Sequence, residues 1–425
     1  MISGEEIMLN RFINNTVWQV AGKVFQMLVG LFVYAWIARY LGPDDLGSLS
    51  YTLSYITFFT SIANLGINNV IIKELVDNRN NEGLVLGSSL VLRLLSSTLS
   101  WITVVILAYF ITQGNETLII ITLLQGLSLI FQQFELIRYW YNSHLNSKVA
   151  TLVITAAYLL LTIYRIIILL LKGDIYLFAF ATAFEQISLA LLLYLSYRKY
   201  SDQKLKFSKQ VAIDILRKSH HFIYAGLIMT MFNQMDKIML GLLKTTKEVG
   251  YYTIALGINS MWSFVITAII SSAEPIIMTS FNENKEKYEK LIKRLYASIF
   301  YLSILAGIAI TILSKYIIII LYGSKYLPSV DILKLTSWIV VFTQLNIARG
   351  IWIVCEKKEK YLTYMLVIGA FMNVILNYFL IKEFGAMGAA IATILTQFVV
   401  AIIIPLFFKE TRESSILILK GIIFR

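Results

Sequence analysis

Cysteine, histidine and charge are all scarce in this sequence of 425 residues. The only cysteine, Cys355, excludes an intramolecular disulfide and a cysteine-based metal cluster. Two of the three histidines, His220 and His221, are adjacent and follow basic residues, which indicates a membrane–water interface rather than a metal site. Charged residues make up 15% and hydrophobic residues 58%. A soluble protein of this length needs more polar surface, so the mean hydropathy of +0.73 indicates a protein embedded in lipid.

Motifs for catalysis are missing as well. The chain has no Walker glycine loop, no HExxH pair and no glycine–serine nucleophile elbow. ATP-driven chemistry by this chain is therefore not expected, no cofactor is expected, and we interpret the protein as a non-enzyme. The net charge of +12 comes from Lys and Arg in short segments between apolar runs. This pattern is typical of loops that face anionic lipid and argues against nucleic acid as a partner.

Long apolar runs fill most of the chain. A helix needs about 20 largely apolar residues to span a bilayer, and about twelve stretches qualify. The first run is longer than the apolar region of a signal peptide and contains Gln19, Lys23 and Gln26, so we interpret it as a retained transmembrane helix. The predicted spans are 12–39, 46–72, 84–112, 117–141, 149–171, 175–197, 220–243, 249–280, 295–321, 328–354, 361–381 and 386–408.

The basic residues predict how the chain lies in the membrane. Most of them fall in the loops that would share one side with both termini. By the positive-inside rule we expect a multi-pass protein of the cytoplasmic (inner) membrane with both termini in the cytoplasm. The basic segment 198–218 lies near the midpoint and predicts two six-helix lobes, residues 1–205 and 206–425. The charged segment 282–294 is predicted to form a helix on the membrane surface.

A short repeat supports two similar halves. Asp45-Leu46-Gly47-Ser48-Leu49 follows the first predicted span, and Glu248-Val249-Gly250-Tyr251-Tyr252 follows the seventh. The two turns are separated by about half of the chain. Parallel repeats related by an axis along the membrane normal are a known plan of transporters, in which the substrate is held between the halves.

Four motifs then resemble a known family in the same order. They are Ala38-Arg39-Tyr40-Leu41-Gly42-Pro43-Asp44-Asp45-Leu46-Gly47, the stretch from Asp236 to Tyr252, Leu321-Tyr322-Gly323-Ser324-Lys325-Tyr326, and Phe384-Gly385-Ala386-Met387-Gly388-Ala389-Ala390. The chain resembles, over essentially its full length, the polysaccharide exporters. These include the O-antigen and capsular repeat-unit flippases of the multidrug/oligosaccharidyl-lipid/polysaccharide exporter superfamily.

This resemblance implies an all-α fold of about twelve transmembrane helices, arranged as two pseudo-symmetric lobes around a central cavity. It implies a substrate made of a short oligosaccharide on undecaprenyl diphosphate, moved from the cytoplasmic to the outer leaflet by alternating access. Ion coupling is common in the family, and H⁺ or Na⁺ is the expected ion. The implied partners are the lipid-linked oligosaccharide, the bilayer, and the polymerase and chain-length proteins of the same pathway.

Five cations within or near the spans are candidates for a cavity that binds the diphosphate. Lys23, Arg93 and Arg165 lie well inside their spans, where an unpaired cation is costly unless it faces water or a partner. The arginine fork suits phosphate, but a structural pair is the alternative. Arg138 and Arg349 are nearer span ends, where snorkelling to the interface explains them. Glu135 precedes Arg138 by three residues and is expected to pair with it.

Four further residues are candidates for ion coupling or gating. Glu185 lies near the middle of its span and either carries a proton or pairs with Arg165. Asp236 has Lys237 beside it, but adjacent helix residues point apart, so we expect its partner on another helix. Glu274 precedes Pro275, where a helix kink or a gate is expected, the kink being the simpler reading.

Two other functions stay open on the sequence alone. A cation-coupled drug exporter of the same superfamily would prefer an acidic and aromatic cavity to a cationic one. A membrane glycosyltransferase or polymerase usually carries a large extracytoplasmic loop or a soluble domain, and the predicted outer loops here are short.

Overall fold

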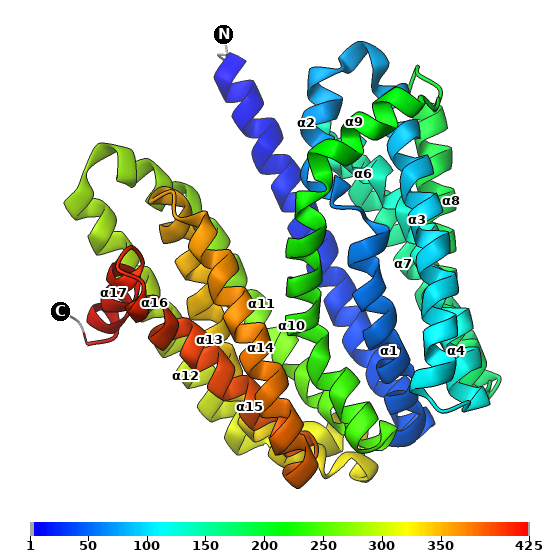
Figure 1. Cartoon of the computed structure of the whole chain (residues 1–425), viewed down its shortest axis with the longest axis vertical. Coiled ribbons are helices and arrows are strands. Elements are labelled where there is room, and N and C mark those ends of the chain that lie inside the picture. The colour runs from blue at the N-terminus through cyan, green and yellow to red at the C-terminus, as the bar shows by residue number, and fades with distance from the viewer. Residues whose placement is uncertain (1–3, 424–425) are drawn as a thin grey trace. The chain divides into compact units, whose positions relative to one another are not determined.

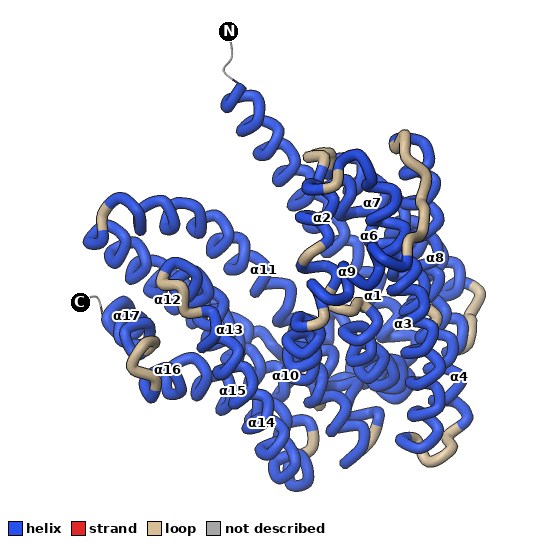
Figure 2. Tube along the Cα trace, turned by 45° about the horizontal axis from the view of Figure 1, so that its top comes forward, coloured by secondary structure: helices blue, strands red, loops and turns tan. Residues whose placement is uncertain are grey.

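The computed structural model describes the backbone of residues 4–423 and the side chains of residues 26, 27 and 29–423. Within this range the chain is helical, with turns and short loops and no strand (Figure 2). The expected all-α membrane fold is therefore confirmed. Contacts divide the chain into two compact units: Met1–Leu41 with Thr52–Thr230, and Gly42–Tyr51 with Met231–Arg425. The lobe boundary predicted at residue 205 stays a prediction.

The helix α1 (Gly4–Ala63) changes direction at Gly42. Gly42 has a φ of 78°, in the left-handed region that glycine adopts without steric cost, and Pro43 follows it. α1 therefore contributes two helices, as the spans 12–39 and 46–72 predict. The second helix ends earlier than predicted, at Ala63, because Leu65 and Gly66 both adopt positive φ.

The first unit packs its long helices α3, α4, α7 and α8 side by side (Figure 1). Side chains of Asn115 and Asp174 cap α4 and α8 by accepting from the amides of Leu118 and Leu177. The predicted span 117–141 is one continuous helical stretch, Glu116–Ser143, that changes between α-helical and 3-10 geometry along its length. The elements of this unit after α1 are η1 (Ile67–Asn69), α2 (Ile71–Asp77), η2 (Arg79–Asn81), α3 (Glu82–Ile111), α4 (Glu116–Gly126), α5 (Ser128–Phe131), η3 (Gln132–Glu135), α6 (Leu136–Ser143), α7 (Ser147–Leu170), α8 (Ile175–Tyr200) and α9 (Lys209–Ser219).

The second unit packs α13 against α11, α12 and α15. Its core contains Trp352, Tyr296 and the isoleucine rows of α11 and α12. Its elements are most of α10 (His221–Leu243), then α11 (Thr246–Glu283), α12 (Lys285–Tyr322), η4 (Ser324–Tyr326), α13 (Ser329–Cys355), α14 (Glu359–Phe384), α15 (Ala386–Phe398), the π-helical segment η5 (Val399–Ile403), α16 (Ile404–Phe407) and α17 (Arg412–Ile422).

The separate surface helix predicted over 282–294 is wrong. α11 and α12 extend through this charged segment and are interrupted only at Asn284, which is extended (φ −155°, ψ 115°). The side chain of Asn284 accepts a hydrogen bond from the amide of Lys287 and so starts α12. One residue is enough to end one helix and cap the next, and the charges belong to the ends of both.

The two repeated turns meet inside the second unit. A Cβ atom built on Gly47 would lie 1.8 Å from the carbonyl oxygen of Thr246, and one built on Gly250 would lie 2.2 Å from that of Pro43. Lys247 Nζ lies 3.7 Å from a carboxylate oxygen of Asp44. The start of the helix after Gly42 and the start of α11 therefore touch backbone to backbone, and only glycine fits at the contact.

Nine of the described helical stretches are long and apolar enough to cross a membrane. They correspond to nine of the predicted spans. Of the other three, 12–39 and 46–72 lie in α1 and 220–243 lies in α10. The polar run around Asp236 and Lys237 lowers the apolar character of α10. The protein is thus a multi-pass membrane protein.

Candidate functional site

Asp236 forms the centre of a buried polar cluster in the second unit. The side chain is 6% exposed. Tyr252 Oη donates to its Oδ2 at 2.7 Å, and Thr393 Oγ1 donates to the same oxygen at 2.7 Å. Asn377 Nδ2 donates to Oδ1 at 2.6 Å. Its partners lie on α11, α14 and α15, and all are neutral. The carboxylate is therefore held by three hydrogen bonds from neutral groups, and the adjacent Lys237 interacts with it electrostatically without forming a direct ion pair among the described residues.

Two asparagines of α14 extend this cluster. Asn377 Nδ2 also donates to Asn373 Oδ1 at 2.9 Å, and both side chains are buried. Asn377 Oδ1 is buried and receives no hydrogen bond from the described residues. An orphaned carbonyl oxygen beside a carboxylate is unusual, because buried acceptors are normally paired. We call Asp236, Tyr252, Asn373, Asn377 and Thr393 the Asp236 cluster.

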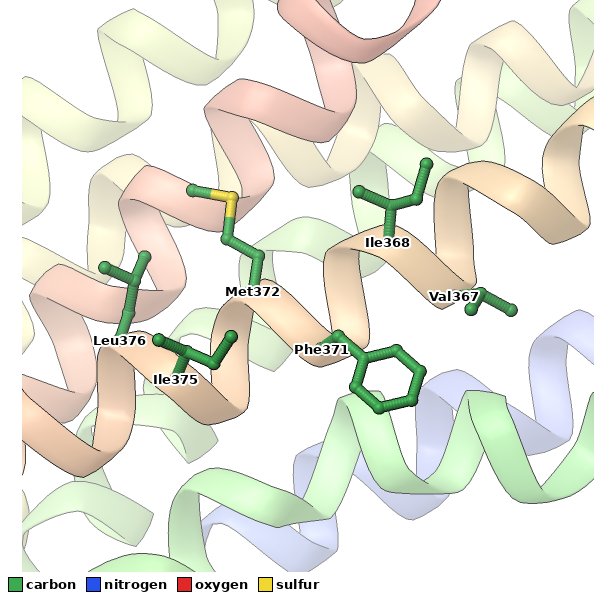
Figure 3. Close-up of a pocket in the computed structure, with 6 residues that line it drawn as sticks. All are labelled: Val367, Ile368, Phe371, Met372, Ile375 and Leu376. Carbon is green, nitrogen blue, oxygen red and sulfur yellow. The ribbon is translucent and has the colours of Figure 1, made fainter.

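The opposite face of α14 is apolar and open. A groove of about 410 Å³ is lined by six of its residues (Figure 3), of which Phe371 is 62% exposed. α14 therefore presents the amides of Asn373 and Asn377 to the interior of the second unit and apolar side chains on its opposite face. The residues that line the groove are Val367, Ile368, Phe371, Met372, Ile375 and Leu376.

Arg93 is buried in the first unit and its donors are occupied. It is 1% exposed, and its guanidinium donates to Gln133 Oε1 at 2.5 Å, to Asn68 Oδ1 at 2.8 Å and to Asn64 Oδ1. The arginine thus ties α3 to η3 and to the turn after α1. Three amide oxygens accept its hydrogen bonds, and the acid Glu135 interacts with it electrostatically without direct contact. Sequence reasoning missed these three amides because it sought ionisable partners.

Three half-buried charges lie together in the first unit, on η3, α7 and α8. Glu185 interacts electrostatically with Arg165 and with Glu135, and Glu135 interacts in turn with Arg93. Arg165 and Glu185 do not close to an ion pair, and Arg165 makes no hydrogen bond to the described residues. Glu135, Arg165 and Glu185 form what we call the charged cluster. Its charges are near one another but not neutralised by direct contact.

Arg349 does not snorkel to the interface, as a position near the span end suggested. It is 2% exposed, and its guanidinium donates to the carbonyl oxygens of Val400, at 2.9 Å, and of Ala401. Both carbonyls belong to the π-helical segment η5. A π-helical turn changes which amide each carbonyl faces, so an outside donor can satisfy it. Arg349 therefore stabilises the irregular turn from α13.

Replacing Arg349 by leucine is expected to destabilise the second unit. The substitution removes the buried guanidinium group and leaves two buried carbonyls without this donor, at a cost of about 1–3 kcal/mol for each. The loss is measured as a lower midpoint of thermal unfolding of the purified protein. Arg198→Leu, at an exposed position on α8, is the control. Equal midpoints for the two variants would show that Arg349 contributes no stability.

The remaining predicted residues occupy separate places. Arg138 is half-buried with its guanidinium carbon 5.4 Å from the ring centre of Tyr139, and its Nε lacks a partner among the described residues. The ion pair expected between Glu135 and Arg138 is not formed; that prediction was wrong, because Glu135 ends η3 and turns toward Arg93 and Glu185. The side chain of Lys23 lies outside the described residues.

Lys237 and Glu274 are both half-buried in the second unit. Neither makes a hydrogen bond or an ion pair with the part of the chain that the structure describes. α11 runs through Pro275 as one continuous helix. Of the candidates, the structure therefore brings together Arg165 and Glu185, with Arg93 linked to them through Glu135, and it leaves Asp236 with neutral partners. The four-residue spacing of Asn373 and Asn377 within an apolar span is the signal that could have revealed the Asp236 cluster.

Comparison with known proteins identifies the family of the chain. The profile of the family described as polysaccharide biosynthesis protein matches residues 12–281. The chain is 27% identical to an uncharacterized membrane protein of Methanocaldococcus jannaschii over 246 residues, 53% of this chain and 45% of that protein. It is 24% identical to a probable low-salt glycan biosynthesis flippase, Agl15, of Haloferax volcanii over 199 residues, 47% of this chain and 42% of that protein. The chain thus matches less than half the length of either relative.

Solved structures share the fold at low sequence identity. One is an inward-facing multidrug resistance MATE family transporter of the MOP superfamily (TM-score 0.72, 16% identity, 92% of this chain and 95% of that one). Another is the lipid II flippase MurJ in an inward closed conformation (TM-score 0.71, 15% identity, 96% and 91%). The family profile covers more than half of the chain. This protein therefore belongs to the polysaccharide biosynthesis protein family and has the fold of the MOP superfamily transporters.

Proposed function

We propose that this protein is a flippase that moves a lipid-linked oligosaccharide across the cytoplasmic membrane for surface polysaccharide assembly. The carrier lipid is undecaprenyl diphosphate, and both termini lie in the cytoplasm. Membership of the family and similarity to a probable glycan flippase support the proposal. The observation that carries it is the charged cluster, because charges kept half-buried within apolar spans are costly and are seldom retained for packing alone.

Arg165 is the residue of the cluster suited to the diphosphate. Its planar fork can donate two parallel hydrogen bonds to phosphate oxygens, and no hydrogen bond to the described residues occupies it. Glu185 balances its charge when no substrate is bound. The prenyl chain stays in lipid while the polar head crosses, and the two lobes rock to expose the head to each leaflet in turn.

The Asp236 cluster is the proposed site of ion coupling. A single carboxylate, the Thr393 hydroxyl and the orphaned Asn377 Oδ1 offer oxygen ligands, which hard cations prefer. One negative charge among neutral oxygens fits a monovalent ion, H⁺ or Na⁺, better than a divalent one. No group of three or more His, Cys, Asp or Glu suited to a metal ion occurs in the described chain.

Replacing Arg93 by alanine and replacing Arg165 by alanine are expected to have different effects. Arg165→Ala should leave the amount of folded protein unchanged, since the side chain makes no hydrogen bond to the described residues, and should lower surface glycan by about tenfold or more. Arg93→Ala should lower the yield of folded protein, because three amide oxygens lose their donor. Glycan display and membrane protein content are measured in the same cells. Normal glycan display in the Arg165 variant would contradict its role in binding.

The function itself is tested in a strain that lacks this gene. Lipid-linked saccharides are extracted and identified by mass spectrometry, and their accessibility to an external glycosidase is measured on intact cells. A flippase predicts complete repeat units that accumulate on the carrier lipid and stay shielded inside. Units that lack a sugar would indicate an assembly enzyme instead. An unchanged pool with altered drug susceptibility would indicate a drug exporter.

A further inference from the structure

A second polar cavity lies in the first unit, apart from the charged cluster. Its volume is about 400 Å³, within the usual range for small-ligand sites of roughly 300–1,000 Å³. It is formed where three connections meet: η2 with the start of α3, the turn after α6, and the segment Ser201–Gln203 that follows α8. All three connections are predicted to face the cytoplasm, the side on which a lipid-linked saccharide is assembled in the proposed function.

The floor of the cavity is a neutralised and rigid network around Glu82, which is 4% exposed. Trp140 Nε1 donates to Glu82 Oε2 at 2.7 Å, and Arg79 Nη1 donates to Oε1 at 2.9 Å. Arg79 Nη2 donates to the carbonyl oxygen of Ser143 at 2.6 Å. His144 Nε2 lies 3.4 Å from Glu82 Oε1. The cation of the floor is therefore already paired and is not free for an anion.

The wall formed by the segment after α8 is fixed by the side chain of Gln203 and by the backbone of Lys206. Gln203 Nε2 donates to the carbonyl oxygen of Arg79 at 2.9 Å, and the amide of Gly83 donates to Gln203 Oε1 at 2.9 Å. The amide of Lys206 donates to the carbonyl oxygen of Gly83 at 3.0 Å. A Cβ atom on Gly83 would lie 2.3 Å from the carbonyl oxygen of Lys204. The segment is therefore held against α3 and cannot drift over the cavity.

Three side chains at the rim are exposed and uncommitted. Asn146, Tyr200 and Asp202 all line the cavity, and none of them makes a hydrogen bond from its side chain to the described residues. Tyr200 is 53% exposed, and Lys199 Nζ lies over one face of its ring at 5.6 Å from the ring centre, which leaves the other face for stacking. The amide of Asn146 can donate to and accept from a ligand hydroxyl group, and the carboxylate of Asp202 can accept from one. The ring of Tyr200 can stack on an apolar face of the ligand. Preorganisation of this kind favours binding because little entropy is lost.

This chemistry selects a neutral polyhydroxylated ligand. A phosphate or an anionic lipid headgroup needs a free cation. Among the residues that line the cavity the only arginine is paired, and Asp202 adds a negative charge, while Lys199, outside the lining, lies over the Tyr200 ring. A sugar ring offers vicinal hydroxyls to the carboxylate and amide and a C–H face to the tyrosine ring. None of the residues that line the cavity belongs to the charged cluster of Glu135, Arg165 and Glu185.

We propose that the cavity bounded by Asn146, Tyr200 and Asp202 binds sugar residues of the cargo on the cytoplasmic side, at a distance from the groups that bind the diphosphate. This inference rests on the proposed function and deepens it, since it assigns the recognition of the saccharide to a place distinct from the recognition of its phosphate. The cavity accepts sugar residues while Arg165 of the charged cluster accepts the diphosphate.

The test uses the full-length protein in nanodiscs and two probes from the same source. Lipid-linked saccharides are extracted from the deletion strain, and half of the extract is treated with mild acid to release the sugars from lipid and phosphate. Binding of the released sugars, and separately of the untreated lipid-linked saccharides, is measured for the wild type, for Tyr200→Ala/Asp202→Asn and for Asn146→Ala. Asn80→Ala, an exposed amide of η2 outside the cavity, is the control.

The wild type and the Asn80 variant are expected to bind the released sugars equally, and the cavity variants to bind them at least about tenfold more weakly. The inference would be overturned if the released sugars bound neither the wild type nor the Asn80 variant, or if they bound all variants alike. The proposed function as a flippase would be unaffected. Cavity variants that bind the released sugars like the wild type but lose binding of the untreated lipid-linked saccharides would overturn it in favour of a site for the lipid or its phosphate. An extract that contains no lipid-linked saccharide would overturn the proposed function, and the inference with it.

Discussion

Replacing Gly250 by alanine is expected to destabilise the protein strongly, by about 1–3 kcal/mol or more as an overpacked contact. The new methyl group would lie 2.2 Å from the carbonyl oxygen of Pro43, and that carbonyl is backbone, so it cannot turn away as a side chain could. The reciprocal change, Gly47→Ala, meets the carbonyl of Thr246 at 1.8 Å and is expected to be worse. Thermal unfolding and the monodisperse fraction after size-exclusion chromatography measure both effects.

Gly257→Ala is the matched control for this prediction. Gly257 lies on the same helix, α11, and a Cβ atom there would meet nothing within 4 Å. Because alanine favours a helix interior over glycine by up to about 1 kcal/mol, this variant should be neutral or slightly more stable. If Gly250→Ala unfolded at the same temperature as Gly257→Ala, the close contact between the two turns would not exist in the membrane.

Asp236→Asn is expected to lower the rate of cation-dependent transport by at least about 100-fold, while the variant still folds. Asparagine keeps the shape of the side chain and can still accept hydrogen bonds from Tyr252 and Thr393. It cannot carry the negative charge that a bound cation requires. Movement of lipid-linked saccharide from one leaflet of proteoliposomes to the other is measured with and without an imposed Na⁺ or H⁺ gradient. Binding of radioactive Na⁺ is measured on the same samples.

Glu274→Gln provides the comparison, since it removes a half-buried acid of the same unit that has no hydrogen bond to the described residues. It should keep gradient-dependent transport near the wild-type rate. Transport by the Asp236 variant that still responds to the gradient would show that the cluster only holds α10 against α11, α14 and α15. Loss of response in both variants would indicate that coupling is spread over several acids.

Much of the architecture could be predicted from apolar runs and glycine turns. The break between the first two helices follows from Gly42 and Pro43, and nine of the predicted spans coincide with helices that can cross a membrane. The pairing of Gly47 with Gly250 could not be predicted, because a repeat shows that two turns are alike and not that they touch. The prediction of a separate helix over 282–294 was wrong because the charges of this segment suggested an element of its own. In the structure Asn284 alone divides two long helices.

The sites were harder to predict than the helices. A search for charge found Arg93, Arg165, Glu185 and Asp236, but the partners of Arg93 and Asp236 are amides and hydroxyls that carry no charge. Neutral polar residues are common enough in membrane helices that a single one predicts nothing. Their meaning arises only when different helices bring them within hydrogen-bonding distance, which is a property of the packing and not of the local sequence.

The π-helical turn Val399–Ile403 has a consequence for the evolution of the last membrane helix. Such a turn is equivalent to one extra residue accommodated in an α-helix, because the turn widens to take it. Deleting a single position there would restore a regular helix, in which the carbonyls of the turn bond to amides of the same helix. Arg349, which occupies two carbonyls of this turn, would then lose both of these acceptors. The inserted residue and the arginine are therefore expected to be gained or lost together among relatives, as one inherited unit.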